Sequence, residues 1–72
     1  MDTVIIDESI TMESVKRDLP DIDVRMPDGS TTRCRIANRG GSFALVYLPV
    51  GTTECAWTTI VRCLRTNQPV AY

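Results

Sequence analysis

Arginine supplies almost all of the positive charge of this chain, and its planar guanidinium grips carboxylates and phosphates through paired hydrogen bonds. Seven of the eight basic residues are arginine, and lysine occurs once. Two arginines alternate along one stretch, a third lies at the adjoining turn, and two more are three residues apart near the C-terminus. We expect these five to form a cationic interaction surface: Arg33, Arg35, Arg39, Arg62 and Arg65.

The acidic residues gather towards the other end of the chain. Residues 1–30 carry eight acids and three bases, a formal charge of −5, whereas residues 31–72 carry five bases and one acid, a formal charge of +4. Such asymmetry between halves indicates charged partners. Some of these acids are expected to face arginines across a hairpin, where the charges cancel. The acids that we expect to remain available to a partner are Asp7, Glu8, Glu13 and Asp18.

The residues needed for catalysis are poorly represented. Histidine is absent, so serine and threonine lack the commonest general base, and the one lysine, Lys16, falls in a predicted helical stripe. Asp21 and Asp23 alternate on the wet face of a predicted strand, which favours solvation over acid–base work. The glycine-rich stretch 38–42 is typical of a hairpin turn, because a phosphate loop normally leads into a helix N-terminus. We expect no enzymatic activity and no cofactor.

The cysteines indicate reduced thiols. There are three of them, without a Cys-x-x-Cys motif, and together with the lack of histidine this argues against a structural zinc site. Packing as small hydrophobic side chains is the expected role. The alternative role is that of a reactive thiol. Cys34 is the best candidate for it, because Arg33 and Arg35 flank it and nearby positive charge lowers a thiol pKa. Strand alternation, however, directs Cys34 to the face opposite both arginines.

The length and hydropathy of the chain limit the classes of protein to which it can belong. Seventy-two residues predict a single domain over residues 1–72. No apolar run approaches the roughly 20 residues that span a bilayer. The N-terminus opens with an acid and lacks a basic region followed by a long apolar one, so it does not resemble a signal peptide. We therefore expect a cytoplasmic protein without a membrane partner.

Local patterns predict one strand and one helix in the first third of the chain. Thr3–Ile6 is a β-branched run typical of a short strand. A helix is predicted from the cap residue Thr11 to Leu19, with apolar residues at helical spacing. Pro20 ends it, because the residue before a proline avoids the helical region.

Three strands are predicted next. Ile22–Met26 and Thr31–Ala37 alternate apolar and polar residues, and Met26–Ser30 between them has strong turn chemistry. After the turn at 38–42, the strand Phe43–Leu48 is apolar on both faces, which is typical of a covered or interior strand.

A second helix is predicted after the third strand. Thr52 or Thr53 would cap it, and Glu54 would lie in its first turn. Asn67 can serve as a left-handed stop. The tail 69–72 either adds a short edge strand or frays. The expected core face covers an arc of about 160° and consists of Ala56, Trp57, Ile60, Val61, Cys63 and Leu64.

This element order predicts an α+β fold, in which two helices pack on a three-stranded antiparallel meander (an α-β-β-β-α core) with a short extra N-terminal strand. Residues 11–66 are similar in element order to double-stranded-RNA-binding domains. Those domains carry a lysine-rich cluster at the start of the second helix, where this chain has residues 53–56, Thr-Glu-Cys-Ala. No RNA-binding residue is therefore carried over, and no family is assigned.

The third strand raises the question of an exposed apolar face. If both helices cover one face of the sheet, either Phe43, Leu45 and Tyr47 or their alternating neighbours point outward. Such a patch would mark an interface. The alternative is that Thr3–Ile6 or the C-terminal tail buries it. The three aromatic residues Phe43, Tyr47 and Trp57 are expected in the core, which leaves Tyr72 as the one exposed aromatic ring.

These observations favour a small non-enzymatic protein-binding module, such as an inhibitor, a small subunit or an adaptor, with homodimerisation as one form of binding. One version is a mobile-element inhibitor whose acidic segment competes for a nucleic-acid-binding surface. The alternative is nucleic-acid binding through an arginine face on the second strand and last helix. The acidic balance of the whole chain and the shortage of stacking aromatics argue against it.

Overall fold

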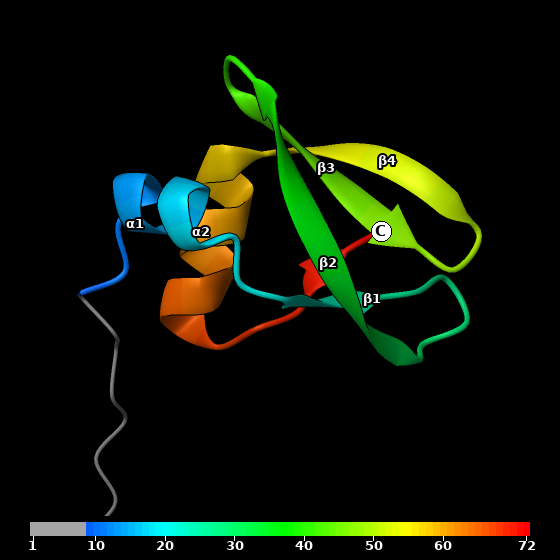
Figure 1. The fold of residues 1–72 in the computed structure, drawn as a ribbon. Helices are drawn as coiled ribbons and strands as arrows, with labels where there is room; N and C mark the ends of the chain where they lie inside the picture. The colour runs from blue at the N-terminus through cyan, green and yellow to red at the C-terminus, as the bar shows by residue number, and fades with distance from the viewer. Residues whose placement is uncertain (1–8) are drawn as a thin grey trace, which may run out of the picture.

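The computed structural model describes residues 9–72, and in this range it contains two helices and one curled five-stranded sheet (Figure 1). The α+β class is therefore confirmed. The predicted strand at Thr3–Ile6 lies outside the described residues. The elements in chain order are α1 (Met12–Asp18), β1 (Ile22–Arg25), β2 (Thr31–Gly40), β3 (Phe43–Leu48), β4 (Gly51–Ala56), α2 (Trp57–Thr66) and β5 (Val70–Ala71).

The first helix forms where local sequence signals place it. The Thr11 hydroxyl accepts a hydrogen bond from the Ser14 backbone amide at 3.1 Å, and the Thr11 amide donates to the Ser14 hydroxyl at 3.0 Å. This reciprocal capping box satisfies amides that a helix start otherwise leaves free. At the other end Leu19 adopts a left-handed conformation with φ 47°. Pro20 explains this end, because the preceding residue is kept out of the helical region.

The first hairpin also follows the prediction. One oxygen of the Asp28 carboxylate accepts hydrogen bonds from the Ser30 amide and hydroxyl, at 2.9 and 2.6 Å. Gly29 has φ 90°, a region that side chains disfavour. This turn joins β1 to β2 in an antiparallel pair that places Asp23 opposite Arg33.

The prediction of a second helix starting at Thr52 or Thr53 was wrong. Gly51–Ala56 is the strand β4, which pairs with β3 along its whole length through a tight turn at Pro49 and Val50. The helix α2 begins only at Trp57. A threonine can cap a helix or sit in a strand, and here the ladder with β3 satisfies the backbone of residues 51–56 more completely than a first helical turn would.

The three-stranded meander is consequently extended to a larger sheet. Its order is β4-β3-β2-β1-β5, antiparallel except that β5 pairs parallel to β1. The tail thus adds an edge strand, one of the two expected outcomes. The core order α-β-β-β-α is replaced by a helix, four strands, a helix and a strand, so the similarity in element order to double-stranded-RNA-binding domains does not extend to the structure.

Both helices pack on the inner face of the curled sheet (Figure 1). Trp57 and Ile60 of α2 are completely buried there, and Val15 of α1 joins them. The predicted apolar arc of α2 is thereby confirmed for its central residues. The buried core as a whole consists of Val15, Ile22, Val24, Cys34, Ile36, Ala44, Val46, Leu48, Trp57, Ile60, Val61 and Val70.

Candidate functional site

The outer face of the sheet, which points away from both helices, carries the most distinctive surface of the described residues. Along β3 the side chains alternate, so Ala44, Val46 and Leu48 enter the core. The remaining three form an outward row. Phe43 is 46% exposed, Tyr47 is 47% exposed, and Leu45 between them is half-buried.

An arginine borders this row on the neighbouring strand. Arg35 of β2 lies directly opposite Tyr47, and Ala37 lies opposite Leu45. Arg33 lies two residues before Arg35, but it pairs with Asp23 of β1 and lines a cavity together with residues of α2. We call the surface formed by Arg35, Phe43, Leu45 and Tyr47 the outer patch.

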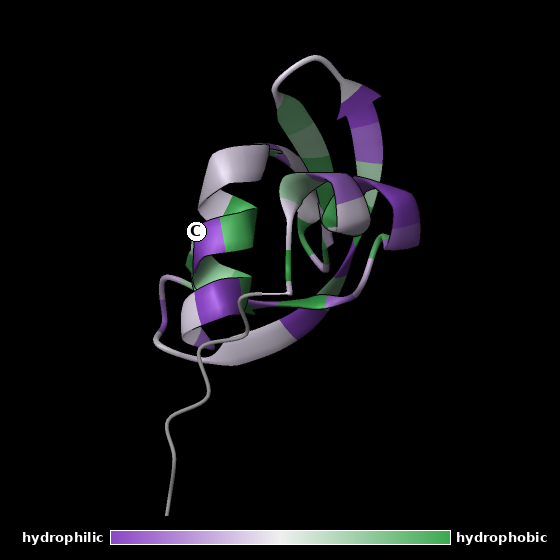
Figure 2. Cartoon of the chain, turned by 90° about the vertical axis from the view of Figure 1, so that its left-hand side faces the viewer, coloured by the Kyte–Doolittle hydropathy of each residue, from purple (hydrophilic) through white to green (hydrophobic). Residues whose placement is uncertain are grey.

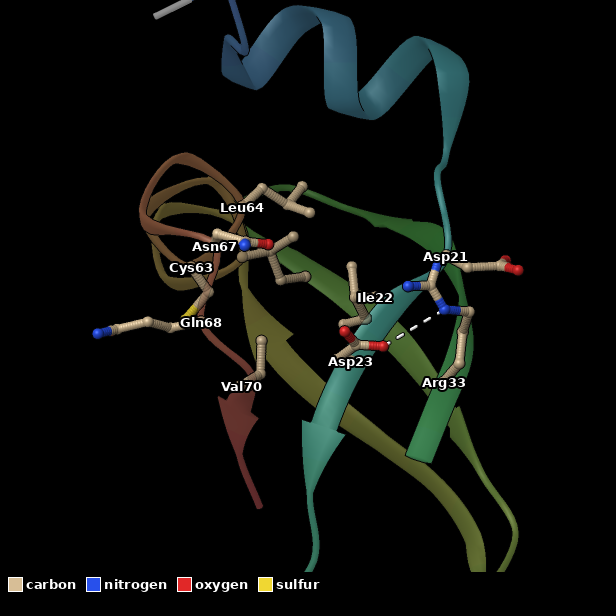
Figure 3. Close-up of a pocket in the computed structure, with 10 residues that line it drawn as sticks. Asp21, Ile22, Asp23, Arg33, Cys63, Leu64, Asn67, Gln68 and Val70 are labelled. Atoms are coloured by element: carbon tan, nitrogen blue, oxygen red, sulfur yellow. Dashed lines mark ion pairs between the residues drawn. The ribbon is translucent and has the colours of Figure 1, made fainter. Parts of the chain in front are cut away.

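Two of the sequence-predicted arginines have carboxylate partners. Arg33 Nε lies 3.3 Å from Asp23 Oδ1, as expected across the first hairpin, and Arg39 Nε lies 3.0 Å from Glu54 Oε1. Figure 3 shows the Asp23–Arg33 pair as a dashed line. These pairs are solvent-exposed and so contribute little to stability, but they compensate charge locally. Among residues 9–72, Arg35 has no such ion pair, so its guanidinium is available to a partner at the outer patch.

The other predicted charged residues lie elsewhere. Arg62 and Arg65 are on the exposed side of α2, away from the outer patch, and Arg65 Nε donates to the Ile10 carbonyl at 2.7 Å. Asp18 on α1 pairs with its neighbour Arg17 at 3.2 Å, and Glu13 is in the first turn of the same helix. Asp7 and Glu8 lie outside the described residues. The structure therefore does not gather the seven that it describes on one surface.

Sequence reasoning left two interpretations of Phe43 and Tyr47, one in the core and one on an outward face of the third strand, and the structure agrees with the outward one. Trp57 is fully buried as predicted, but Phe43 and Tyr47 are on the outer face rather than in the core. The alternation within Phe43–Leu48 defined the two possible rows, and the structure shows that Ala44, Val46 and Leu48 form the buried one. Neither the C-terminal tail nor any other described segment buries the outward row: β5 pairs with β1, and the tail lines a cavity with Val46, which faces the core.

The thiols do not form a reactive site. Cys34 is buried in the core, and burial, followed by the nearby charges of Asp21 and Asp23, raises the pKa of its thiol. Burial and the neighbouring Cys63 likewise raise the pKa of Cys55. These shifts favour the unreactive protonated thiol at neutral pH. Within residues 9–72 no cluster of three or more histidine, cysteine or acidic side chains is arranged to hold a metal ion.

One small cavity lies between β1, β5 and the C-terminal end of α2 (Figure 3). Its volume is about 140 Å³, below the 300–1,000 Å³ typical of small-molecule sites. Asp23 and Arg33 at its rim already bind each other, and Figure 3 shows Gln68 pointing outward. It is therefore a packing gap rather than a ligand pocket.

Comparison with known proteins adds no family. No family model, no curated protein and no solved structure matches this chain. In the described part of the chain, neither helix is long and apolar enough to cross a membrane.

Proposed function

We propose that this protein is a non-enzymatic protein-binding module that uses the outer patch. The observation that carries the proposal is the exposure of Phe43 and Tyr47, nearly half in each case, on a sheet face bordered by Arg35. Aromatic and arginine side chains are the residue types most enriched at the energetically important centres of protein interfaces.

The residue types of the outer patch indicate which kind of surface its partner must have. Phe43, Leu45 and Tyr47 offer an apolar strip, and Arg35 offers paired hydrogen-bond donors beside it. The matching surface is an apolar patch with a carboxylate at its margin, since the guanidinium fork binds carboxylates bidentately. An inhibitor, a small subunit and an adaptor all fit this description and differ only in the partner.

The experiment compares partner capture by matched tyrosine variants. Wild-type protein, Tyr47→Ser and Tyr72→Ser serve as baits in a lysate of the cells that make the protein, followed by quantitative mass spectrometry. Tyr72 is a suitable control because it is 56% exposed and follows β5, which β2 and β1 separate from β3 in the sheet order. We expect a partner that the wild type and Tyr72→Ser retain and Tyr47→Ser loses.

Purified components then test the interaction directly. The captured protein should bind the wild type with an affinity that falls on Arg35→Gln substitution and at higher salt. Light scattering of the bait alone shows whether a second copy is the partner. A strict monomer whose captured proteins are the same with and without Tyr47 would rule out the outer patch as an interface.

The second candidate function is nucleic-acid binding, which the exposure of Phe43 and Tyr47 favours. Bases stack on exposed aromatic rings, and each such contact is worth about 1–3 kcal/mol. A shift assay at about 50 mM salt, where the electrostatic contribution is strongest, tests it with single- and double-stranded probes. Combined Arg33→Ala and Arg35→Ala substitution should weaken binding and flatten its salt dependence. No shift of either probe at this salt concentration would eliminate this candidate.

A further inference from the structure

A second surface, separate from the outer patch, lies between the two helices. A shallow groove of about 500 Å³ runs along the exposed side of α2 beside the start of α1. Figure 2 views the molecule from this side, and α2 shows alternating hydrophilic and hydrophobic bands. The residues that line the groove are Met12, Thr58, Val61, Arg62, Arg65 and Thr66.

The apolar part of the groove comes from residues that also belong to the packing of the helices. Val61 is almost completely buried within the core, and Met12 is packed against the core from the first turn of α1. Their remaining accessible atoms form an apolar floor between the helices. This apolar floor therefore favours contact with an apolar side chain of a ligand.

Two arginines stand at the border of this floor. Arg62 and Arg65 are three residues apart on α2, a spacing that places side chains on the same helical face. Arg65 is held by the hydrogen bond from its Nε to the Ile10 carbonyl, which leaves the donors of its two terminal nitrogens available. Among residues 9–72, Arg62 has neither an ion pair nor a side-chain hydrogen bond.

We propose that this groove is a docking site for an acidic amphipathic helix of a partner protein. Its apolar side chains would lie on Met12 and Val61, and carboxylates spaced three or four residues apart would pair with Arg62 and Arg65. Charge complementarity selects an acidic occupant over a basic one. The site is independent of the outer patch, because the helices and the outer sheet face lie on opposite sides of the core. With both sites occupied, the chain would link two partners.

The test uses a defined probe, a 15-residue peptide of leucine and glutamate with leucine at helical spacing i, i+3, i+4 and i+7. A second peptide carries lysine in place of every glutamate. Titration into ¹⁵N-labelled full-length protein, followed by two-dimensional NMR, locates the binding site and gives the affinity. We expect the acidic peptide to shift amides of 58–66 and Met12, and the basic peptide to leave them unmoved.

Two variants distinguish binding in the groove from non-specific attraction between the peptide and exposed arginines. Arg62→Gln should raise the dissociation constant about three- to tenfold, as expected for the loss of a partly exposed ion pair with hydrogen bonds. Arg17→Gln is the matched control, because Arg17 is an exposed arginine on α1 outside the groove. It should leave the affinity unchanged. Dispersed NMR spectra verify that both variants are folded.

Several results would overturn the proposal. These are shifts confined to the outer face of β2 and β3, equal affinity for the acidic and basic peptides, equal losses in Arg62→Gln and Arg17→Gln, or no binding at 1 mM peptide and about 50 mM salt, where electrostatic attraction is strong. The Tyr47→Ser comparison tests the outer patch separately, so the failure of one proposal does not imply the failure of the other.

Discussion

Arg35 lies directly opposite Tyr47 across β2 and β3, and both side chains project from the sheet face that the helices leave open. Directly opposed side chains in an antiparallel pair are close enough to interact. A cation and an exposed ring in neighbouring positions can bind a carboxylate and an apolar group of the same partner at the same time. This relationship, rather than the number of arginines, distinguishes the outer patch from an ordinary solvated sheet.

The first prediction separates binding from folding. Tyr47→Ser should lower the free energy of unfolding by less than about 1 kcal/mol, because the ring is largely exposed and loses only cross-strand contacts. Ile60→Ala should lower it by about 2–5 kcal/mol, because Ile60 is completely buried. Urea denaturation followed by tryptophan fluorescence measures both. A large destabilisation by Tyr47→Ser would mean that the ring serves the fold.

The second prediction concerns the helix starts, where the structure shows a capped and an uncapped helix. Thr11→Ala should cost about 1 kcal/mol, because the capping hydroxyl of α1 is lost. Ala56, at the N-cap position of α2, has an extended backbone and makes no side-chain cap bond. Ala56→Ser should therefore stabilise the protein by up to about 1 kcal/mol. Thermal unfolding should show shifts of opposite sign, and equal signs would contradict the assignment of the caps.

The uncapped helix also explains what the sequence could not reveal. Thr11, Asp28 and Asn67 act through hydrogen bonds or backbone conformations within a few residues, so local chemistry was enough to predict α1, the first turn and the end of α2. Residues 51–56 present the same threonine and glutamate signals as a helix start. Their pairing with β3 decides the outcome, and that contact depends on the whole hairpin.

The position of the outer patch depends on a still less visible feature. A β-bulge between Asn38 and Gly40 shifts the β2–β3 register by one residue. Gly40 pairs with Phe43. If the strands kept this register without the bulge, Arg35 would lie opposite Leu48, which is a core residue. The glycines at 40 and 41 both have positive φ, which permits this geometry. The sequence indicated a turn here, but not the shift that brings Arg35 to Tyr47.

The third prediction tests thiol accessibility. In folded protein Cys34 should be alkylated by iodoacetamide more slowly than Cys55 and Cys63, because Cys34 is buried and the other two are half-buried. Its raised pKa further reduces the thiolate fraction. Peptide mass spectrometry over a time course gives the three rates. In denaturant the rates should converge, whereas fastest labelling of Cys34 in folded protein would restore the reactive-thiol alternative.

The fourth prediction concerns the Asp28 turn in acid. The hydroxyl and amide of Ser30 hold the pKa of the Asp28 carboxyl below its ordinary value of 3.8. A carboxyl with a lowered folded-state pKa contributes stability that is present above the unfolded value and is lost as the pH falls through the folded value. Ser30→Ala removes the larger cause, so it should move the Asp28 pKa back towards 3.8 and shrink the loss of stability below that pH.

An NMR titration of the Asp28 side-chain carboxyl resolves the shift in the wild type and the variant. Asn38→Ala is the matched control, because its side chain accepts an equivalent hydrogen bond from the Gly40 amide in the other turn. This change should leave the Asp28 pKa unaltered. If Ser30→Ala also leaves it unaltered, the Ser30 hydroxyl does not hold the carboxylate, and the lowered pKa must come from the Ser30 backbone amide, which the variant keeps.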